Sequence, residues 1–101
     1  MVLHREFLTI TPATGTGTGT TIANLNGMIR QILVNPTTAT TTYEMSITDI
    51  SSLITYKTTG RIGQMAPTTA IPIKGPCTIT ISNASVDEEF TVVLVIEKPI
   101  D

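Results

Sequence analysis

The sequence predicts an all-β fold: an antiparallel β-sandwich of about seven to eight short strands, jelly-roll-like or Ig-like, with a small barrel as the alternative. Three observations predict it. Of the 101 residues, 21 are threonine and 14 are isoleucine, and side chains branched at Cβ favour strands over helices. Glycine and proline interrupt the chain at short intervals. Finally, no segment repeats its apolar residues with the period of a helix.

The chain is predicted to be one β domain over residues 1–101. Its residues are 41% hydrophobic, which suffices for one core without a metal or a disulfide. That core must be aliphatic, because there are two tyrosines, two phenylalanines and no tryptophan. Residues 1–12 are a candidate extended arm, and residues 13–21, rich in glycine and threonine, are predicted to be a flexible loop.

The first predicted strand covers residues 3–11 and is ended by Pro12. Alternation divides its side chains between two faces: Leu3, Arg5, Phe7 and Thr9 on one, and His4, Glu6, Leu8 and Ile10 on the other. Residues 21–25 are predicted to be a short strand. Asn26-Gly27 then predicts a two-residue hairpin turn, since both residue types tolerate positive φ, and residues 28–34 form the returning strand.

Residues 43–49 show the clearest alternation of apolar and polar residues in the chain. It directs Tyr43, Met45 and Ile47 to the core and Glu44, Ser46 and Thr48 to water. Residues 49–52 are predicted to be a turn, with Asp49 as its turn-forming residue, and residues 53–57 form the returning strand.

Residues 58–68 contain two glycines and are predicted to be a second long loop, of a length that is often functional. Residues 71–73 are expected to be extended, and Gly75-Pro76 to turn the chain. Residues 77–82 follow as a strand and residues 83–89 as a polar turn. Residues 90–96 are apolar on both faces, which predicts a central strand.

Charge and hydropathy exclude several classes of partner. The net charge is −2, and the lysines and arginines stand singly rather than in a basic patch: Lys57, Lys74, Lys98, Arg5, Arg30 and Arg61. We therefore expect no nucleic acid as partner. No apolar run approaches the ~20 residues of a membrane span and no signal peptide is recognisable, so we expect synthesis in the cytoplasm and no membrane partner.

Residues that usually carry catalysis are scarce. His4 is the only histidine, and with Glu6 on its face of the strand it predicts an exposed contact rather than a catalytic couple. Cys77 is the only cysteine, so it cannot form a disulfide within the chain. It lies on the side of Ile79 and Ile81 and is expected to be a small buried hydrophobe. We predict no catalytic residue and no enzymatic activity.

The sequence also predicts no cofactor and no metal. Residues 15–20 lack the glycine spacing, the helix and the lysine of phosphate-binding loops. Residues 87–89, Asp-Glu-Glu, offer too few converging oxygens for calcium and predict a solvated hairpin tip. One histidine and one cysteine cannot supply the four ligands of a zinc site. The sequon at residues 83–85 is interpreted as a turn.

Several stretches resemble small virion proteins of tailed bacteriophages: residues 26–36, residues 37–49, residues 75–84 and residues 90–97. The likeness extends over residues 22–97. The likeness is one of general sequence character and strand order. It includes no catalytic motif, and it assigns no functional residue to this chain. It implies an oligomeric structural module, often a trimer, that lies on a capsid lattice.

The expected function is therefore that of a non-enzymatic phage structural protein that decorates or cements the capsid by bridging its subunits. Its partners would be the major capsid protein or other virion proteins and further copies of itself, and its location the virion. A tail, baseplate or head–tail component is one alternative. A carbohydrate- or receptor-binding module is another, but only Tyr43 or Tyr56 could serve as its exposed aromatic platform, and Tyr43 is predicted to face inward. Because the chain carries few charged residues, we expect it to have apolar surface that a partner covers.

Overall fold

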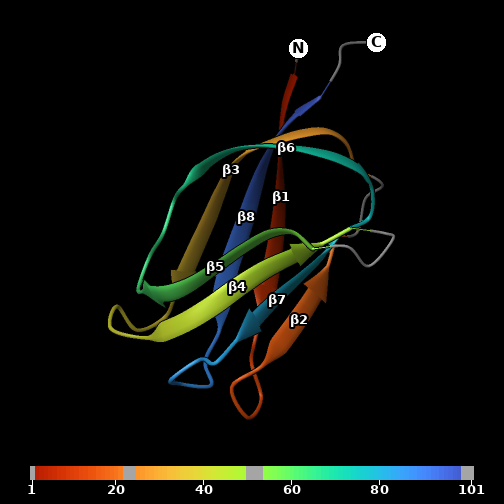
Figure 1. Ribbon diagram of the computed structural model, residues 1–101. Helices are drawn as coiled ribbons and strands as arrows, with labels where there is room; N and C mark the ends of the chain where they lie inside the picture. The colour runs from red at the N-terminus through yellow and green to blue at the C-terminus, as the bar shows by residue number, and fades with distance from the viewer. Residues whose placement is uncertain (1, 22–24, 50–53, 99–101) are drawn as a thin grey trace.

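The structure is a computed structural model that describes residues 2–21, 25–49 and 54–98 of the chain (Figure 1). The side chains of Leu25, Ile54 and Thr55 are outside this description. The described part contains eight β-strands and no helix. The strands form two four-stranded sheets in which all pairs are antiparallel.

Each sheet takes strands from both halves of the chain. Sheet I contains, in spatial order, β1 (Val2–Ile10), β8 (Phe90–Lys98), β3 (Leu25–Pro36) and β6 (Thr68–Gly75). Sheet II contains β2 (Gly17–Thr20), β7 (Thr78–Ser82), β4 (Thr42–Thr48) and β5 (Ile54–Ile62). The all-β sandwich is confirmed, and two separate sheets replace the alternative of a small barrel.

The strand order is that of an eight-stranded jelly roll. The first strand pairs with the last, the second with the seventh, the third with the sixth and the fourth with the fifth. The chain is thus one long antiparallel hairpin, wrapped so that its paired arms supply both sheets. This order favours the jelly-roll form over the Ig-like form.

The core lies between the sheets and consists mainly of aliphatic side chains, as predicted. The inward positions of β4 are Tyr43, Met45 and Ile47, which confirms the predicted alternation of this strand. Opposite them, β8 lies between β1 and β3, so residues 90–96 are central as predicted. The other buried residues include Ile10, Ile29, Ile32, Val34, Ile73, Cys77, Ile79, Ile81, Phe90, Val92, Leu94 and Ile96.

The predicted hairpin at Asn26-Gly27 is wrong, because both residues lie inside β3. Gly27 pairs with Ile73 of β6 on one side and approaches β8 on the other. A Cβ at Gly27 would collide with the Glu97 carbonyl oxygen. Glycine is needed there for the close approach of two strands, which local sequence does not distinguish from a turn. Of the strand predicted at residues 21–25, residues 22–24 lie outside the described part.

The predicted flexible loop at residues 13–21 becomes a strand from Gly17 onward. Gly17 and Gly19 face inward, where a Cβ would meet Pro12 and Ile10, while Thr18 and Thr20 face outward and are exposed. The alternation of glycine and threonine is therefore the period-2 pattern of a strand. Because glycine has no side chain, the inner face of β2 can lie close to the end of β1.

The predicted loop at residues 58–68 is also shorter than expected. β5 continues to Ile62, and residues 63–67 link it to β6. Two register shifts against β4 accommodate the extra residues, and Gly60 adopts a positive φ of 65° within the strand. The turn predicted at residues 49–52 lies outside the described residues except for Asp49, which directly follows β4.

Residues 2–10 are not a separate arm within this chain. β1 pairs with β8 of the same chain in an unbroken register from Val2–Lys98 to Ile10–Phe90. The predicted division of its faces is borne out, since Leu3, Arg5, Phe7 and Thr9 are exposed whereas Glu6 and Ile10 are buried. β1 is thereby an edge strand of sheet I.

Candidate functional site

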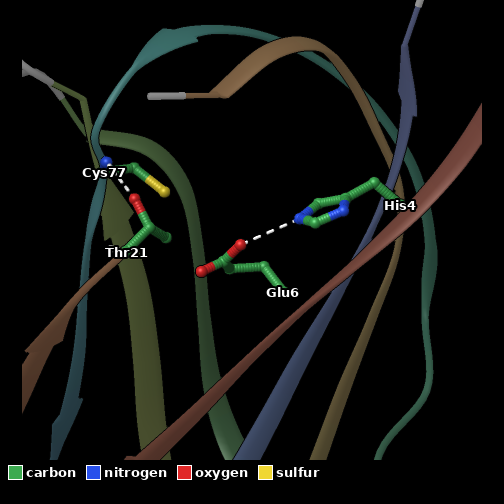
Figure 2. Close-up of polar contacts among 4 residues, drawn as sticks. All are labelled: His4, Glu6, Thr21 and Cys77. Carbon is green, nitrogen blue, oxygen red and sulfur yellow. Dashed lines mark hydrogen bonds and ion pairs between the residues drawn. The ribbon is translucent and has the colours of Figure 1, made fainter. Parts of the chain in front are cut away.

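A small polar cluster lies between the sheets at the β1 side of the sandwich (Figure 2). His4 and Glu6 follow each other on the inner face of β1, so their side chains meet, with His4 Nε2 2.9 Å from Glu6 Oε2. Glu6 is only 8% exposed. The expected exposed contact is therefore a part-buried one, because the inner face of β1 is covered by sheet II.

Cys77, the residue directly before β7, faces the same cluster (Figure 2). It is buried, as predicted, and its backbone N–H donates a hydrogen bond to Thr21 Oγ1 at 3.1 Å. Burial raises the pKa of the Cys77 thiol, an interaction of the thiol itself with the Thr21 hydroxyl opposes this, and the negative charge of Glu6 adds to the rise. The thiol is consequently held in its protonated form.

This geometry does not activate a nucleophile. A nucleophilic cysteine needs a base beside it or a lowered pKa. Here the imidazole of His4 bonds to Glu6 instead, and a carboxylate raises the pKa of the Cys77 thiol. Across the described residues, no group of three or more His, Cys, Asp and Glu side chains is placed to hold a metal ion. The His4–Glu6 contact is thus a part-buried polar pair within β1.

The acidic turn between β7 and β8 has a role that the sequence did not reveal. Asp87 accepts hydrogen bonds from the backbone N–H groups of Thr14 and Gly15, both at 2.9 Å. Thr14 and Gly15 have positive φ values of 54° and 86°, so the carboxylate supports a tight turn. The predicted solvated hairpin tip is thus an anchor for the loop that precedes β2.

Glu88 anchors a second loop in the same way. Its carboxylate accepts hydrogen bonds from the Thr38 N–H at 3.0 Å, the Thr38 hydroxyl at 2.8 Å and the Thr41 hydroxyl. The Thr41 hydrogen bond is the main cause that lowers the pKa of Glu88. These bonds span 47 to 50 residues of chain, so no local signal in the sequence could have indicated them.

Three loops therefore meet at one end of the sandwich, drawn lowest in Figure 1. The predicted turn at residues 83–85 belongs to this end. Asn83 has a positive φ of 51°, and Ser85 exchanges two hydrogen bonds of 2.9 Å with the backbone of Thr42. The carboxylates of Asp87 and Glu88 at this end accept hydrogen bonds from N–H and O–H groups of the same chain.

The outer face of sheet I carries an apolar patch, which we define as Leu3, Phe7, Val93 and Leu33. Leu3 and Phe7 are 60% and 62% exposed. Val93 and Leu33 continue the row from Phe7 across β8 and β3, since Phe7 pairs with Val93 and Val93 pairs with Leu33. Arg5 lies between Leu3 and Phe7 on this face, and Thr9, Gln31 and Asn35 border the patch.

The outer face of sheet II is covered by hydroxyl groups. The strand registers align Thr18, Thr80, Ser46 and Lys57 in one row, and Thr20, Thr78 and Thr48 in the next. The hydroxyls of Thr20 and Thr78 lie 3.3 Å apart. Threonine thus gives this sheet strand-forming side chains with a wet outer surface.

The two tyrosines do not form an exposed platform. Tyr43 is buried, as predicted, and its hydroxyl donates a hydrogen bond to the Gly63 carbonyl at 2.7 Å. Tyr56 is partly buried and packs against the core. Phe7 is the exposed aromatic side chain of the described part, and it belongs to the apolar patch.

No protein-family model matches the chain, and no curated protein matches it in sequence. Among solved structures, the chain is similar to a ruminal GH26 endo-β-1,4-mannanase, with 13% identity and a TM-score of 0.43. That match covers 94% of this chain and 20% of the mannanase, so this chain spans a fifth of that enzyme's length. It is also similar to a carbohydrate-binding module, CBM36, solved with calcium and xylotriose. There the identity is 12% and the TM-score 0.41, over 88% of this chain and 76% of the module.

Within the described residues, no helix is long and apolar enough to cross a membrane.

Proposed function

We propose that this protein is a non-enzymatic structural protein of a phage particle, which decorates or cements the capsid by bridging neighbouring subunits. One observation carries the proposal: the apolar patch of Leu3, Phe7, Val93 and Leu33 on the outer face of sheet I. A single exposed apolar residue needs no explanation. Phe7, Val93 and Leu33, however, adjoin across three strands, and a contiguous apolar group bordered by polar residues is typical of a protein interface.

The rest of the molecule fits such a role. Loops are fixed by Asp87 and Glu88, and the core is filled by aliphatic side chains, so the patch rests on a rigid support. A cement protein needs this property because it acts by adding buried contact area between subunits. Each square ångström of apolar surface that it buries contributes about 25 cal/mol.

The jelly-roll order itself does not choose between functions. Viral capsid domains and lectins both use it, and a fold hosts many functions. The carbohydrate-binding alternative would need an aromatic platform or a polar cluster for sugar rings. Tyr43 is buried, and the outer face of sheet II offers threonine and serine hydroxyls but no aromatic side chain among its described residues. This leaves the protein interface as the better supported reading, with a tail or baseplate position as a variant that differs only in the partner.

The test is co-expression with the major capsid protein encoded in the same genome, followed by sedimentation of the assembled shells. We expect the chain to sediment with the shells. Leu33→Lys, at the centre of sheet I, should weaken this binding by roughly tenfold or more, as for a hot-spot residue. Thr80→Lys, on the outer face of sheet II, is the matched control and should bind as the wild type does.

Absence of the chain from shells would contradict the proposal, as would equal binding by the Leu33→Lys variant. A glycan array run on the same preparation separates the alternative. Specific binding to one class of oligosaccharide, unaffected by Leu33→Lys, would replace the capsid function by the carbohydrate-binding one.

A further inference from the structure

The two sides of the sandwich differ in how their edge strands are protected. On one side, β6 carries Pro72 and Lys74, and β5 carries Lys57 and two register shifts against β4. Proline, charge and bulges are the devices that prevent an edge strand from pairing with another chain. That side of the sandwich is therefore blocked.

The opposite side carries charge at Arg5 and Glu6 of β1 but lacks proline and bulges. β1 runs for nine residues in unbroken register with β8, and it contains neither proline nor a bulge. It exposes Leu3 and Phe7 on its outer face. β2, the edge strand of sheet II on this side, consists of glycine and threonine only. A regular, partly apolar edge is a template for main-chain pairing.

The residues of β1 are complementary to themselves when the strand is reversed. About Arg5 as the centre, an antiparallel copy places Leu3 opposite Phe7 on the outer face. It also places His4 opposite Glu6 on the inner face. We propose that β1 pairs with β1 of a second copy in this register, so that sheet I continues across a two-fold axis at Arg5.

Other registers lose this complementarity. A shift by one position sets inner residues against outer ones. A shift to one neighbouring even register sets Glu6 opposite Glu6, and like charges that face each other are unfavourable. A shift to the other sets His4 opposite His4 and leaves Glu6 without His4 opposite it. The proposed register instead forms two Leu3–Phe7 pairs and two His4–Glu6 pairs. Its one unfavourable contact is Arg5 facing Arg5, on the exposed face where long side chains separate into water.

The pairing shares Leu3 and Phe7 with the apolar patch, but it uses the edge of β1 and needs no capsid partner, so it can hold or fail without the capsid function. It makes a dimer. The phage resemblance implies a trimer, so the mass of the protein in solution distinguishes the two assemblies.

The first experiment measures this mass by analytical ultracentrifugation over a range of concentrations. The wild type should be a dimer, and Phe7→Lys should halve the mass. Ile62→Lys is the matched control, because Ile62 is 66% exposed on β5 at the blocked side, and it should leave the dimer intact. Thermal unfolding checks that each variant is folded, and Leu3→Lys repeats the test if Phe7→Lys is not. A monomeric or trimeric wild type, or a dimer that survives both β1 substitutions, overturns the proposal.

The second experiment tests the register. Arg5 lies on the two-fold axis, where facing Cα atoms are about 4.5–5.5 Å apart, within reach of a disulfide. Arg5→Cys should therefore be cross-linked to its copy on mild oxidation, whereas Thr9→Cys should not. The wild type should not cross-link either, since Cys77 is 1% exposed. Cross-linking of Thr9→Cys in preference to Arg5→Cys would overturn the proposed register.

Discussion

Tyr43 of β4 and Phe90 of β8 join the two sheets through an edge-to-face contact, with ring centroids 5.1 Å apart and ring planes at 75°. Both rings are buried in a core that is otherwise mainly aliphatic. The Tyr43 hydroxyl also donates to the Gly63 carbonyl, which lies in the link between β5 and β6. One side chain thus connects both sheets and a loop.

We expect Tyr43→Phe to lower the free energy of unfolding by about 1–2 kcal/mol, because the buried Gly63 carbonyl loses its donor while the ring contact remains. Phe90→Ala should cost more, about 3–5 kcal/mol, because it leaves a cavity between the sheets. Urea unfolding measures both values. Equal stability of Tyr43→Phe and the wild type would show that this hydroxyl contributes nothing.

Tyr43 also predicts a loss of stability at alkaline pH. Burial raises its pKa to about 12, with Arg61 opposing the rise and Tyr56 adding to it. Between its ordinary pKa of 10.0 and about 12, the folded state keeps the proton that the unfolded state releases, so stability falls as the pH rises. Tyr43→Phe removes this loss. The stabilities of the two proteins should therefore converge as the pH rises across that window, and a constant difference would refute the assignment.

Glu88 predicts the behaviour on the acid side. The hydrogen bonds from Thr41 and Thr38 lower its pKa, so its contribution is present above the unfolded value and lost as the pH falls through the folded value. Glu88→Gln should be less stable than the wild type at neutral pH and equally stable once the carboxylate is protonated. Glu89→Gln is the control and should match the wild type at both pH values. Unfolding midpoints measured across the acid range decide the outcome.

Asp87 should control the loop before β2. Asp87→Ala removes the acceptor for the N–H groups of Thr14 and Gly15, so both amides should exchange with deuterium faster, while amides within β8 keep their protection. Hydrogen exchange followed by NMR resolves the individual amides. Unchanged exchange at residues 14 and 15 would mean that the turn is held without the carboxylate.

Gly27 and Gly60 distinguish a steric clash from backbone strain. Both have positive φ, but a Cβ at Gly27 meets the Glu97 carbonyl oxygen, whereas a Cβ at Gly60 meets no atom within 4 Å. Gly60→Ala should therefore cost about 1–2 kcal/mol from strain alone. Gly27→Ala should cost clearly more, because it also separates β3 from β8. Chemical denaturation of the two variants side by side tests this, and equal costs would exclude the clash.

Cys77 should be unreactive in the folded protein. It is buried and its thiol pKa is raised, so little thiolate is available. We expect a thiol-specific reagent to label Cys77 only as fast as the protein unfolds, and immediately in denaturant. Rapid labelling of the folded protein would show that the β1 side of the sandwich opens.

The sequence predicted the parts of this fold that depend on side-chain alternation. Tyr43, Met45 and Ile47 face the core, the two faces of β1 are divided as expected, and residues 90–96 form a central strand. In these segments each residue's side of the strand follows from its neighbours, since successive side chains point to opposite faces. The buried Cys77 followed from the same pattern.

Tertiary structure alone decided the remaining features, because they depend on residues far apart in the chain. The local sequence at Gly27 indicates a turn, and only the position of β8 beside it shows that glycine is needed for close strand packing. The local sequence at Gly17 and Gly19 indicates a loop, and only the positions of Ile10 and Pro12 show that these glycines lie on the inner face of a strand. The anchoring by Asp87 and Glu88 and the contiguity of Phe7, Val93 and Leu33 likewise exist only once distant strands are paired. The alternation of apolar and polar residues predicts which side of a strand a residue occupies, but only the pairing of strands determines which residues it contacts there.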